Sequence, residues 1–411
     1  MKSMSKIVAV SVLTASVVYA TNGDNMIGVG TQSRAMGGIG VGMGVGTDSV
    51  FRNPAWIVDL DGFNASFGAT AFMPTVKAKV GPAPGLGNGE EGESKSDLSM
   101  IPTVSHSDHI NENLSYGVGM FGVSGMGVDY RNEDPQKGLA NMRTSLQYLR
   151  FVPSISYKYE DWRFGAGISL AYGALSMSAW MPDGVPPGQQ PDPTTAKQRG
   201  GGLSEDFGIG VQVGVGYYVM PNLSVGAYYQ SEVATEYEDV FDFNTDGIYD
   251  SLKLSQPAEA GIGIGYTSEC KCYTIAFDYR RIMWSDADGY DAFGWDDQDV
   301  FAIGGSYNVN DFLVLRAGYN YATSPLHNKT FQGANVGGAP FQAFHVAYFN
   351  TLGFPAYSDT HYTAGLSYEL SKTTGIDLAY VYAPEVTETS MQVLEASNEQ
   401  QSVSATLRFK F

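Results

Sequence analysis

Strict alternation between apolar residues and small or polar residues runs through most of the chain, and it restricts the fold more than any other feature. From Phe207 to Tyr217 every second residue is apolar, and the residues between them are mostly glycine. The segments that start at Trp162 and Ser402 repeat the pattern. Successive side chains of a β-strand point to opposite faces of a sheet, so a period of two predicts strands with one apolar face.

The composition of the two faces predicts that these strands cross a membrane. One face is apolar with aromatic residues towards the strand ends, and the other carries glycine, serine and charged residues. This pattern is typical of a barrel with lipid outside and a polar or small-residue interior. Charged residues make up only 16% of the chain, against about a quarter in an average soluble protein. Because backbone groups in lipid must be paired, we predict an all-β fold, a closed transmembrane antiparallel barrel.

The barrel is expected to have about 14 strands, because we count that many alternating segments. They begin near Phe63, Leu98, Leu114, Ser145, Trp162, Ser204, Leu223, Ser251, Tyr273, Gln298, Phe312, Asp359, Thr374 and Glu399. Short turns alternate with longer connections near 81–97, 131–144, 181–203, 241–250, 291–297 and 329–358. Short turns at one rim and long loops at the other are typical of outer-membrane barrels, and the terminal Phe411 agrees with this class.

Residues 1–20 have the pattern of a secretory signal peptide. Lys2 and Lys6 precede an apolar run, and Val18 and Ala20 provide small residues at a cleavage site. The run is too short for a membrane-spanning helix. We therefore expect an exported protein of the bacterial outer membrane. The net charge of −19 argues against a nucleic-acid partner, because phosphate binding requires clustered basic residues.

Residues 21–58 contain many glycines but lack a strand of barrel length. Within this stretch no glycine triplet has the G-x-G-x-x-G spacing of a dinucleotide site, so we reject a phosphate-binding loop. Glycine allows backbone to approach a wall closely, which fits a compact plug inside the barrel. A disordered periplasmic tail is the alternative. The expected division is therefore a signal peptide at 1–20, a plug or hatch at 21–58 and the barrel at 59–411.

Several short motifs resemble, in order along the chain, those of the FadL family of outer-membrane transporters. They are Arg34–Gly38, Gly46–Ser49, Arg52–Ala55, Tyr116–Gly119, Leu252–Ala258 and Tyr279–Asp286. Members of this family take up long-chain fatty acids or, in a related branch, aromatic hydrocarbons. The resemblance implies a barrel of 14 strands closed by an N-terminal hatch, and passive uptake of hydrophobic molecules without catalysis or cofactor. The hatch residues that it implies are Arg34, Gly37, Gly38, Asp48, Asn53, Pro54 and Ala55.

The resemblance also implies a lateral exit through the barrel wall at a kink in the third strand. The corresponding glycines here are Gly122, Gly125 and Gly127, which permit a kink or bulge. Alternatively, they are ordinary lumen-facing glycines. The expected partners are the hydrophobic substrate, outer-membrane lipid and lipopolysaccharide, and the barrel assembly machinery, with the protein acting as a monomer.

Two regions depart from the fatty-acid members of the family. The connection 181–203 is short and polar, whereas the segment 331–357 is long and rich in aromatic residues. We expect this segment to form an exposed outer surface that captures ligand, because large apolar patches mark binding sites. Self-packing of the same residues as a lid is the alternative. The capture residues would be Phe331, Phe341, Phe344, Tyr348, Phe349 and Phe354.

Other candidate sites carry weaker signals. Asp242, Asn244, Asp246 and Asp250 have the spacing of the first half of a calcium loop, but Lys253 stands where its last carboxylate belongs. A solvated Asp-Gly turn is therefore the preferred interpretation, and no metal or enzyme activity is predicted. Cys270 and Cys272 form either a disulfide or free thiols. The alternative function is a barrel that does not transport hydrophobic molecules, namely an adhesin, a structural protein or a general porin.

Overall fold

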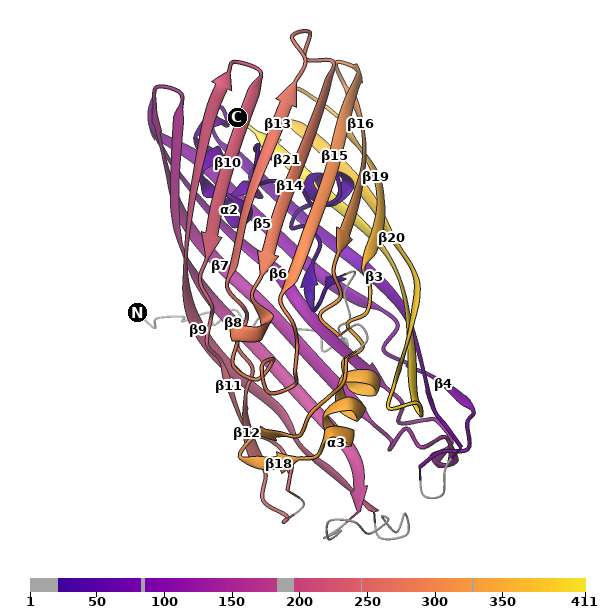
Figure 1. Ribbon diagram of the computed structural model, residues 1–411. Helices are drawn as coiled ribbons and strands as arrows, with labels where there is room; N and C mark the ends of the chain where they lie inside the picture. The colour runs from indigo at the N-terminus through magenta and orange to yellow at the C-terminus, as the bar shows by residue number, and fades with distance from the viewer. Residues whose placement is uncertain (1–20, 83–85, 183–195, 245, 327–328) are drawn as a thin grey trace, which may run out of the picture.

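The computed structural model describes residues 21–82, 86–182, 196–244, 246–326 and 329–411. Within these residues, fourteen strands form one closed antiparallel barrel, because β21 pairs with β3. They are β3 (Asn64–Val80), β5 (Ser99–Asn111), β6 (Leu114–Asp129), β7 (Arg143–Tyr159), β8 (Trp162–Pro182), β9 (Ala196–Met220), β10 (Leu223–Gln230), β13 (Glu259–Thr267), β14 (Tyr273–Ile282), β15 (Gln298–Asn310), β16 (Leu313–Ala322), β19 (Thr360–Glu369), β20 (Thr374–Ser390) and β21 (Leu394–Lys410). The predicted fold class is confirmed (Figure 1).

The alternation in the sequence corresponds to the two faces of the barrel wall. Phe207 is 76% exposed and Ile209 is 71% exposed on the outer face, whereas Gly208 and Gly210 are directed into the lumen. Aromatic and aliphatic side chains therefore face lipid, and glycine and hydroxyl side chains face inward. Among the described residues, no helix is both long enough and apolar enough to span a membrane.

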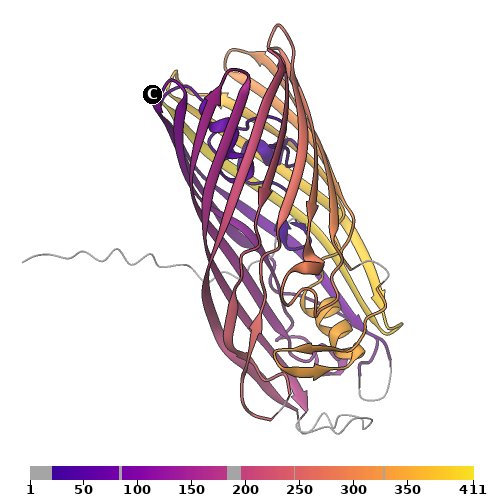
Figure 2. The same cartoon turned by 60° about the vertical axis from the view of Figure 1, so that its left-hand side comes forward.

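The connections differ strongly between the two ends of the barrel. Short turns and the C-terminus lie at one end, which we assign to the periplasm, and long loops lie at the other (Figures 1 and 2). The outer loops contain β4 (Glu91–Glu93), η2 (Pro135–Lys137), the ribbon of β11 (Glu236–Phe241) and β12 (Asp250–Lys253), η4 (Trp284–Asp286), the ribbon of β17 (Ala334–Val336) and β18 (Ala339–Phe341), α3 (Ala343–Tyr348) and the π-helix η5 (Phe349–Gly353).

Three of the predicted strand starts are wrong. The strand expected from Ser251 starts at Glu259, because Ser251 belongs to the outer ribbon β11–β12 and Pro257 cannot donate to a ladder. The strands expected from Ser204 and Glu399 start earlier, at Ala196 and Leu394, since both pairs of strands continue beyond the alternating core of the wall.

Candidate functional site

Residues 21–60, which we call the lumen segment, lie inside the barrel and are mostly buried (Figure 1). The segment contains β1 (Thr21–Asn22), β2 (Asn25–Met26), α1 (Thr31–Ala35), α2 (Ser49–Arg52) and η1 (Pro54–Asp59). Its helices contact strands around much of the wall, including β7, β8 and β9 on one side and β19, β20 and β21 on the other. The segment therefore occupies much of the lumen, next to a pocket of about 730 Å³ that Gln32, Gly46 and Thr47 line together with residues of the wall.

Glycine lets the lumen segment lie directly against the wall between β8 and β16. A Cβ atom on Gly263 would stand 2.5 Å from the backbone nitrogen of Gly42, and one on Gly37 would stand 2.6 Å from the carbonyl oxygen of Tyr319. Gly37 and Gly38 also have positive φ values of 72° and 86°. These positions accept only glycine, since any side chain would push the segment away from the wall.

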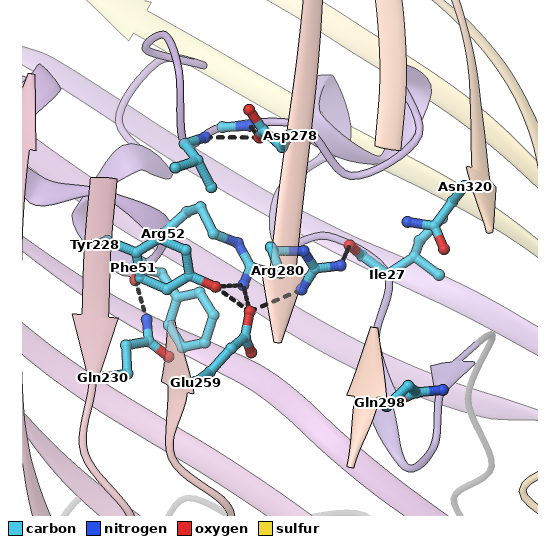
Figure 3. A network of polar contacts seen from close by, with 12 residues as sticks. Ile27, Phe51, Arg52, Tyr228, Gln230, Glu259, Asp278, Arg280, Gln298 and Asn320 are labelled. Atoms are coloured by element: carbon cyan, nitrogen blue, oxygen red, sulfur yellow. Dashed lines mark hydrogen bonds and ion pairs between the residues drawn. The ribbon is translucent and has the colours of Figure 1, made fainter. Parts of the chain in front are cut away.

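A buried ionic cluster fixes the segment to β10, β13 and β14 (Figure 3). Arg52 donates to Glu259 at 2.5 Å, Arg280 donates to the same carboxylate oxygen at 2.9 Å, and the Tyr228 hydroxyl also donates to it. Arg280 further donates to the carbonyl oxygen of Ile27 at 3.1 Å. Because one carboxylate serves two guanidinium groups in a buried site, removing it would leave both without their counter-ion.

The glycine-rich turn of the segment wraps around one carboxylate of the wall. Asp278 on β14 accepts three backbone N–H groups, from Gly40 at 2.7 Å, Val41 at 2.8 Å and Gly42 at 3.0 Å (Figure 3). Consecutive backbone N–H groups in such a turn form an anion-binding nest. In this protein the nest binds a side chain of the barrel.

The Asn-Pro-Ala motif closes the same turn. The Asn53 amide donates to the Val41 carbonyl at 3.0 Å, and its oxygen accepts the Ala55 N–H at 3.2 Å. Pro54 occupies the first position of η1, where a missing N–H costs nothing. The motif is thus a helix cap that also holds the preceding glycine-rich turn.

The remaining predicted hatch residues contact hydroxyl groups on the opposite wall. Arg34 donates to Ser402 at 2.6 Å and to Ser404 at 3.1 Å, and burial lowers its pKa to about 10. Asp48 accepts from Ser105 at 2.8 Å, and burial raises its pKa to about 6. All seven predicted hatch residues therefore lie within the lumen segment and its contacts, although their role as a moving hatch stays a prediction.

The barrel wall has an interruption between β5 and β6. The ladder between them ends at the pair Thr103–Phe121, and Pro102, the next residue of β5, has no N–H to continue it. On the other side of β6 the register with β7 shifts between Gly122 and Ser124, which makes Val123 a bulge. The backbone meets again only at Asp129, whose carbonyl accepts the Lys95 N–H at 2.8 Å. We call the stretch Gly122–Val128 the β6 opening.

The predicted glycines lie along this opening. A Cβ atom on Gly122 would stand 2.5 Å from the Ile101 side chain, so glycine keeps β6 close to β5 without a ladder. Gly125 donates its N–H to the carbonyl oxygen of Asp24 at 3.1 Å, and Gly127 lies against Thr144 of β7. Their part in lateral exit is not established by these contacts and stays a prediction.

The start of the lumen segment lies against the opening from inside. Asn25 of β2 pairs with Ser124 of β6, next to the bond between Gly125 and Asp24. The buried Asp24 carboxylate accepts the Tyr290 hydroxyl proton and a weaker bond from Gln256 at 3.5 Å. Burial raises the pKa of Asp24 to about 6. One residue therefore connects the lumen segment, the β6 opening and an outer loop.

An apolar pocket, which we call the outer pocket, lies beside this connection under the outer loops. Its lining consists of Met126, Leu146, Leu252, Leu254, Tyr290, Phe293, Trp295, Asn350 and Phe354. Met126 belongs to the β6 opening, so pocket and opening share a wall. The pocket volume is about 10 Å³, whereas ligand pockets usually measure about 300–1,000 Å³. A ligand can enter only if these side chains move.

The predicted capture residues pack against one another and do not form the expected exposed surface. Phe331, Phe341, Phe349 and Phe354 are buried in the apolar cluster of the outer loops, with Phe344 and Tyr348 packed against it. The rings of Phe341 and Phe349 are stacked with centroids 5.8 Å apart. Only Phe354 of the six lines the outer pocket. A role in capture stays a prediction that would require the loop to open.

The acidic turn and the cysteines have plain structural roles. Asp242 accepts the N–H groups of Asp246 and Gly247 and pairs with Arg199, and Asp250 accepts the N–H of Phe243. In the part of the chain that the structure describes, no group of three or more His, Cys, Asp or Glu side chains is placed to hold a metal ion. Cys270 and Cys272 form a disulfide in a short turn at the periplasmic end.

The wall residues that dock the segment were not predicted from the sequence. Glu259, Asp278 and Arg280 occupy inward positions of alternating strands, between lipid-facing residues such as Phe277 and Tyr279. Charge at an inward position of a membrane strand was the signal that could have found them. No comparable signal marked Asp24 or Tyr290, because both lie outside the strands.

Comparison with known proteins agrees with this architecture. The sequence matches the family described as outer membrane protein transport protein (OMPP1/FadL/TodX) over residues 7–333. An outer membrane protein of Neisseria meningitidis serogroup B is 21% identical, covering 88% of this chain and 86% of that protein.

Solved structures share the fold. The toluene transporter TodX of Pseudomonas putida superposes with a TM-score of 0.69 at 21% identity, covering 95% of this chain and all of the other. A FadL homologue of Pseudomonas aeruginosa gives a TM-score of 0.73 at 16% identity, with coverage of 94% and 100%. The toluene transporter TbuX of Ralstonia pickettii gives 0.65 at 19% identity, with coverage of 94% and 99%.

Proposed function

Because the chain belongs to the OMPP1/FadL/TodX family of outer membrane transport proteins, we propose that it takes up small hydrophobic molecules by passive diffusion. Two solved relatives are named as toluene transporters and a third as a FadL homologue, which supports hydrophobic substrates for this chain. No cofactor or catalytic residue is required for such uptake. Apolar contacts would supply the binding free energy, at about 25 cal/mol for each Å² buried.

The observation that carries the proposal is the β6 opening beside the outer pocket. A hydrophobic molecule that enters the outer pocket needs a route out that avoids water. The β6 opening lies next to the pocket, because Met126 belongs to both. Below the pocket the lumen is blocked by the segment, which is held by buried ionic and backbone contacts. We therefore propose exit sideways through the β6 opening, with Gly122, Gly125 and Gly127 forming its flexible side.

The lumen segment would act as the hatch of this transporter. Within it, the proposed fixed part is the region that contacts β8 to β16 through glycine and the Glu259 cluster. The part proposed to move is Thr21–Met26, which contacts the opening through Asp24 and Asn25. Residues 1–20 would be removed as a signal peptide on export.

Further partners follow from the same proposal. We expect outer-membrane lipid around the apolar belt, lipopolysaccharide at the acidic outer loops, and the barrel assembly machinery at the terminal strand. Phe411 at the end of this strand packs near Phe63 with ring centroids 5.8 Å apart. The sheet closes on itself through the pairing of β21 with β3, which favours a monomer.

Two measurements test the proposal. Cells that express the protein should accumulate labelled naphthalene faster than cells with empty vector, and purified protein in planar bilayers should conduct ions poorly until residues 21–44 are deleted. Accumulation equal to that of the vector cells would favour the alternative of an adhesin or structural barrel. Open-porin conductance of the intact protein would contradict the hatch.

A further inference from the structure

We infer that the outer pocket selects uncharged hydrocarbons and rejects carboxylates, an inference that rests on the proposed function and names its substrate class. The two candidate classes differ in one property, since a fatty acid carries a negative charge at neutral pH and an aromatic hydrocarbon carries none. The charges around the outer pocket distinguish between them.

The lining of the outer pocket contains no charged residue. Its polar groups are already engaged, because Asn350 accepts the Trp295 indole N–H at 2.9 Å and donates to the Phe293 carbonyl at 2.7 Å. The Tyr290 hydroxyl donates to Asp24. A carboxylate in the pocket would therefore lose its hydration and gain neither a cation nor a free donor.

The carboxylate of Asp24 lies directly behind the pocket wall. It is fully buried and accepts the Tyr290 hydroxyl proton, and no other carboxylate among the described residues accepts from this hydroxyl. If a carboxylate ligand displaced Tyr290, two negative groups would face each other in a site of low dielectric. A hydrocarbon would make no such contact.

The loop above the pocket adds repulsion at long range. In residues 283–297 the aromatic side chains of Trp284, Tyr290 and Trp295 are buried, whereas Asp286, Asp288 and Asp291 are exposed to the medium. This loop therefore presents an apolar face to the pocket and an acidic face to the outside. Such a field lowers the local concentration of anions and does not affect neutral molecules.

Three cations of the outer loops are bound to acids, whereas Lys253, between the pocket residues Leu252 and Leu254, is exposed. Arg199 pairs with Asp242, Lys329 with Asp296, and Arg281 with both Asp297 and Asp299. Arg150 lies deeper in the lumen, where its guanidinium stands over the rings of Phe51 and Tyr148, and it does not line the pocket. The carboxylates of the loop and of Asp24 thus oppose the entry of an anion into the pocket.

The test compares naphthalene with 2-naphthoate, which share a ring system and differ in the carboxylate. Binding of both labelled compounds to the full-length protein in nanodiscs is measured by equilibrium dialysis at pH 7.5, with empty nanodiscs as background. We expect 2-naphthoate to bind at least about tenfold more weakly than naphthalene. Equal binding of the two compounds would overturn the charge selection while leaving hydrophobic transport intact.

A charge variant tests the contribution of the loop. The triple change Asp286→Asn, Asp288→Asn and Asp291→Asn should strengthen 2-naphthoate binding about twofold to fivefold at 10 mM salt and leave naphthalene unchanged, with the gain vanishing at 1 M salt. The matched control Glu112→Gln, Asp161→Asn and Asp311→Asn removes three exposed acids from periplasmic turns and should have no effect. An equal gain in the control would refute the role of the loop. Absence of naphthalene binding would refute the proposed function itself.

Discussion

Replacing Tyr290 with phenylalanine tests the connection between the outer pocket and the β6 opening. The change removes the hydroxyl that donates to the buried Asp24 carboxylate and keeps the ring that lines the pocket. A hydrogen bond to a charged group contributes about 1.5–3 kcal/mol. Its loss should weaken the contact of Thr21–Met26 with the β6 opening. The population of the state in which these residues are detached from the opening should rise about tenfold to a hundredfold. A ligand that pushes Tyr290 aside would act in the same direction.

Hydrogen exchange of the Gly125 amide reports this detachment directly, because Gly125 donates to the Asp24 carbonyl. The Tyr290→Phe protein should exchange this amide about tenfold to a hundredfold faster, with unchanged exchange in β14 and β15. Tyr279→Phe is the matched control, since it removes a Tyr–Asp hydrogen bond of 2.7 Å to Asp299 on the outer side of the wall. Equal protection of Gly125 in wild type and Tyr290→Phe would refute the reasoning.

Three further perturbations have defined outcomes. Burial raises the pKa of Asp24 from 3.8 to about 6. The contribution of Asp24 to the free energy that holds Thr21–Met26 against β6 is therefore fully present below pH 3.8 and is lost as the pH rises through about 6. Gly125 protection, corrected for intrinsic exchange, should be higher at pH 5 than at pH 8. Asp24→Asn should remove this difference, although Asp48 titrates in the same range elsewhere in the segment. Glu259→Gln leaves two buried guanidinium groups without a full counter-charge and should destabilise the docked lumen segment by about 3–5 kcal/mol. The measurement is the rate of protease cleavage within residues 27–52, and unchanged resistance to the protease would exclude the cluster as an anchor. Phe344→Ser with Phe349→Ser should depress naphthalene uptake at equal surface expression, and full uptake would exclude the aromatic loop from capture.

The barrel itself could be predicted from the sequence because its determinant is local. Lipid selects apolar side chains at every second position, so segments such as Phe207–Tyr217 show their strand and their face without reference to any partner. The prediction of strand starts was wrong where the alternating pattern extends beyond the hydrogen-bonded ladder of the barrel, as at Ser251. There the alternation continues into a ribbon of the outer loop, and Pro257 delays the barrel strand to Glu259.

The contacts that make up the candidate site could not be predicted in the same way. The motif Arg52–Ala55 marked the right segment, but Glu259, the partner of Arg52, and Asp278, the partner of the glycine-rich turn, lie more than 200 positions later in the chain. The bond between Asp24 and Tyr290 joins residues 266 positions apart. Such pairs are brought together by closure of the barrel, and no spacing rule of strands or helices contains them. Aromatic composition likewise indicated an apolar loop at 331–357 without showing that its rings face inward.

Lateral exit through the β6 opening is the central claim, and the rate of naphthalene uptake by Gly122→Val tests it most directly. The backbone of Gly122 has no positive φ and can adopt the same conformation with valine, but a Cβ atom there would stand 2.5 Å from the Ile101 side chain, so Ile101 must shift and the added side chain occupies the contact between β5 and β6. Gly305→Val on β15 is the control, because it adds the same side chain to the wall far from the opening. At equal surface expression we expect uptake by Gly122→Val to fall to the level of vector cells, with uptake by Gly305→Val unchanged. Wild-type uptake by Gly122→Val would contradict exit through the wall at β6.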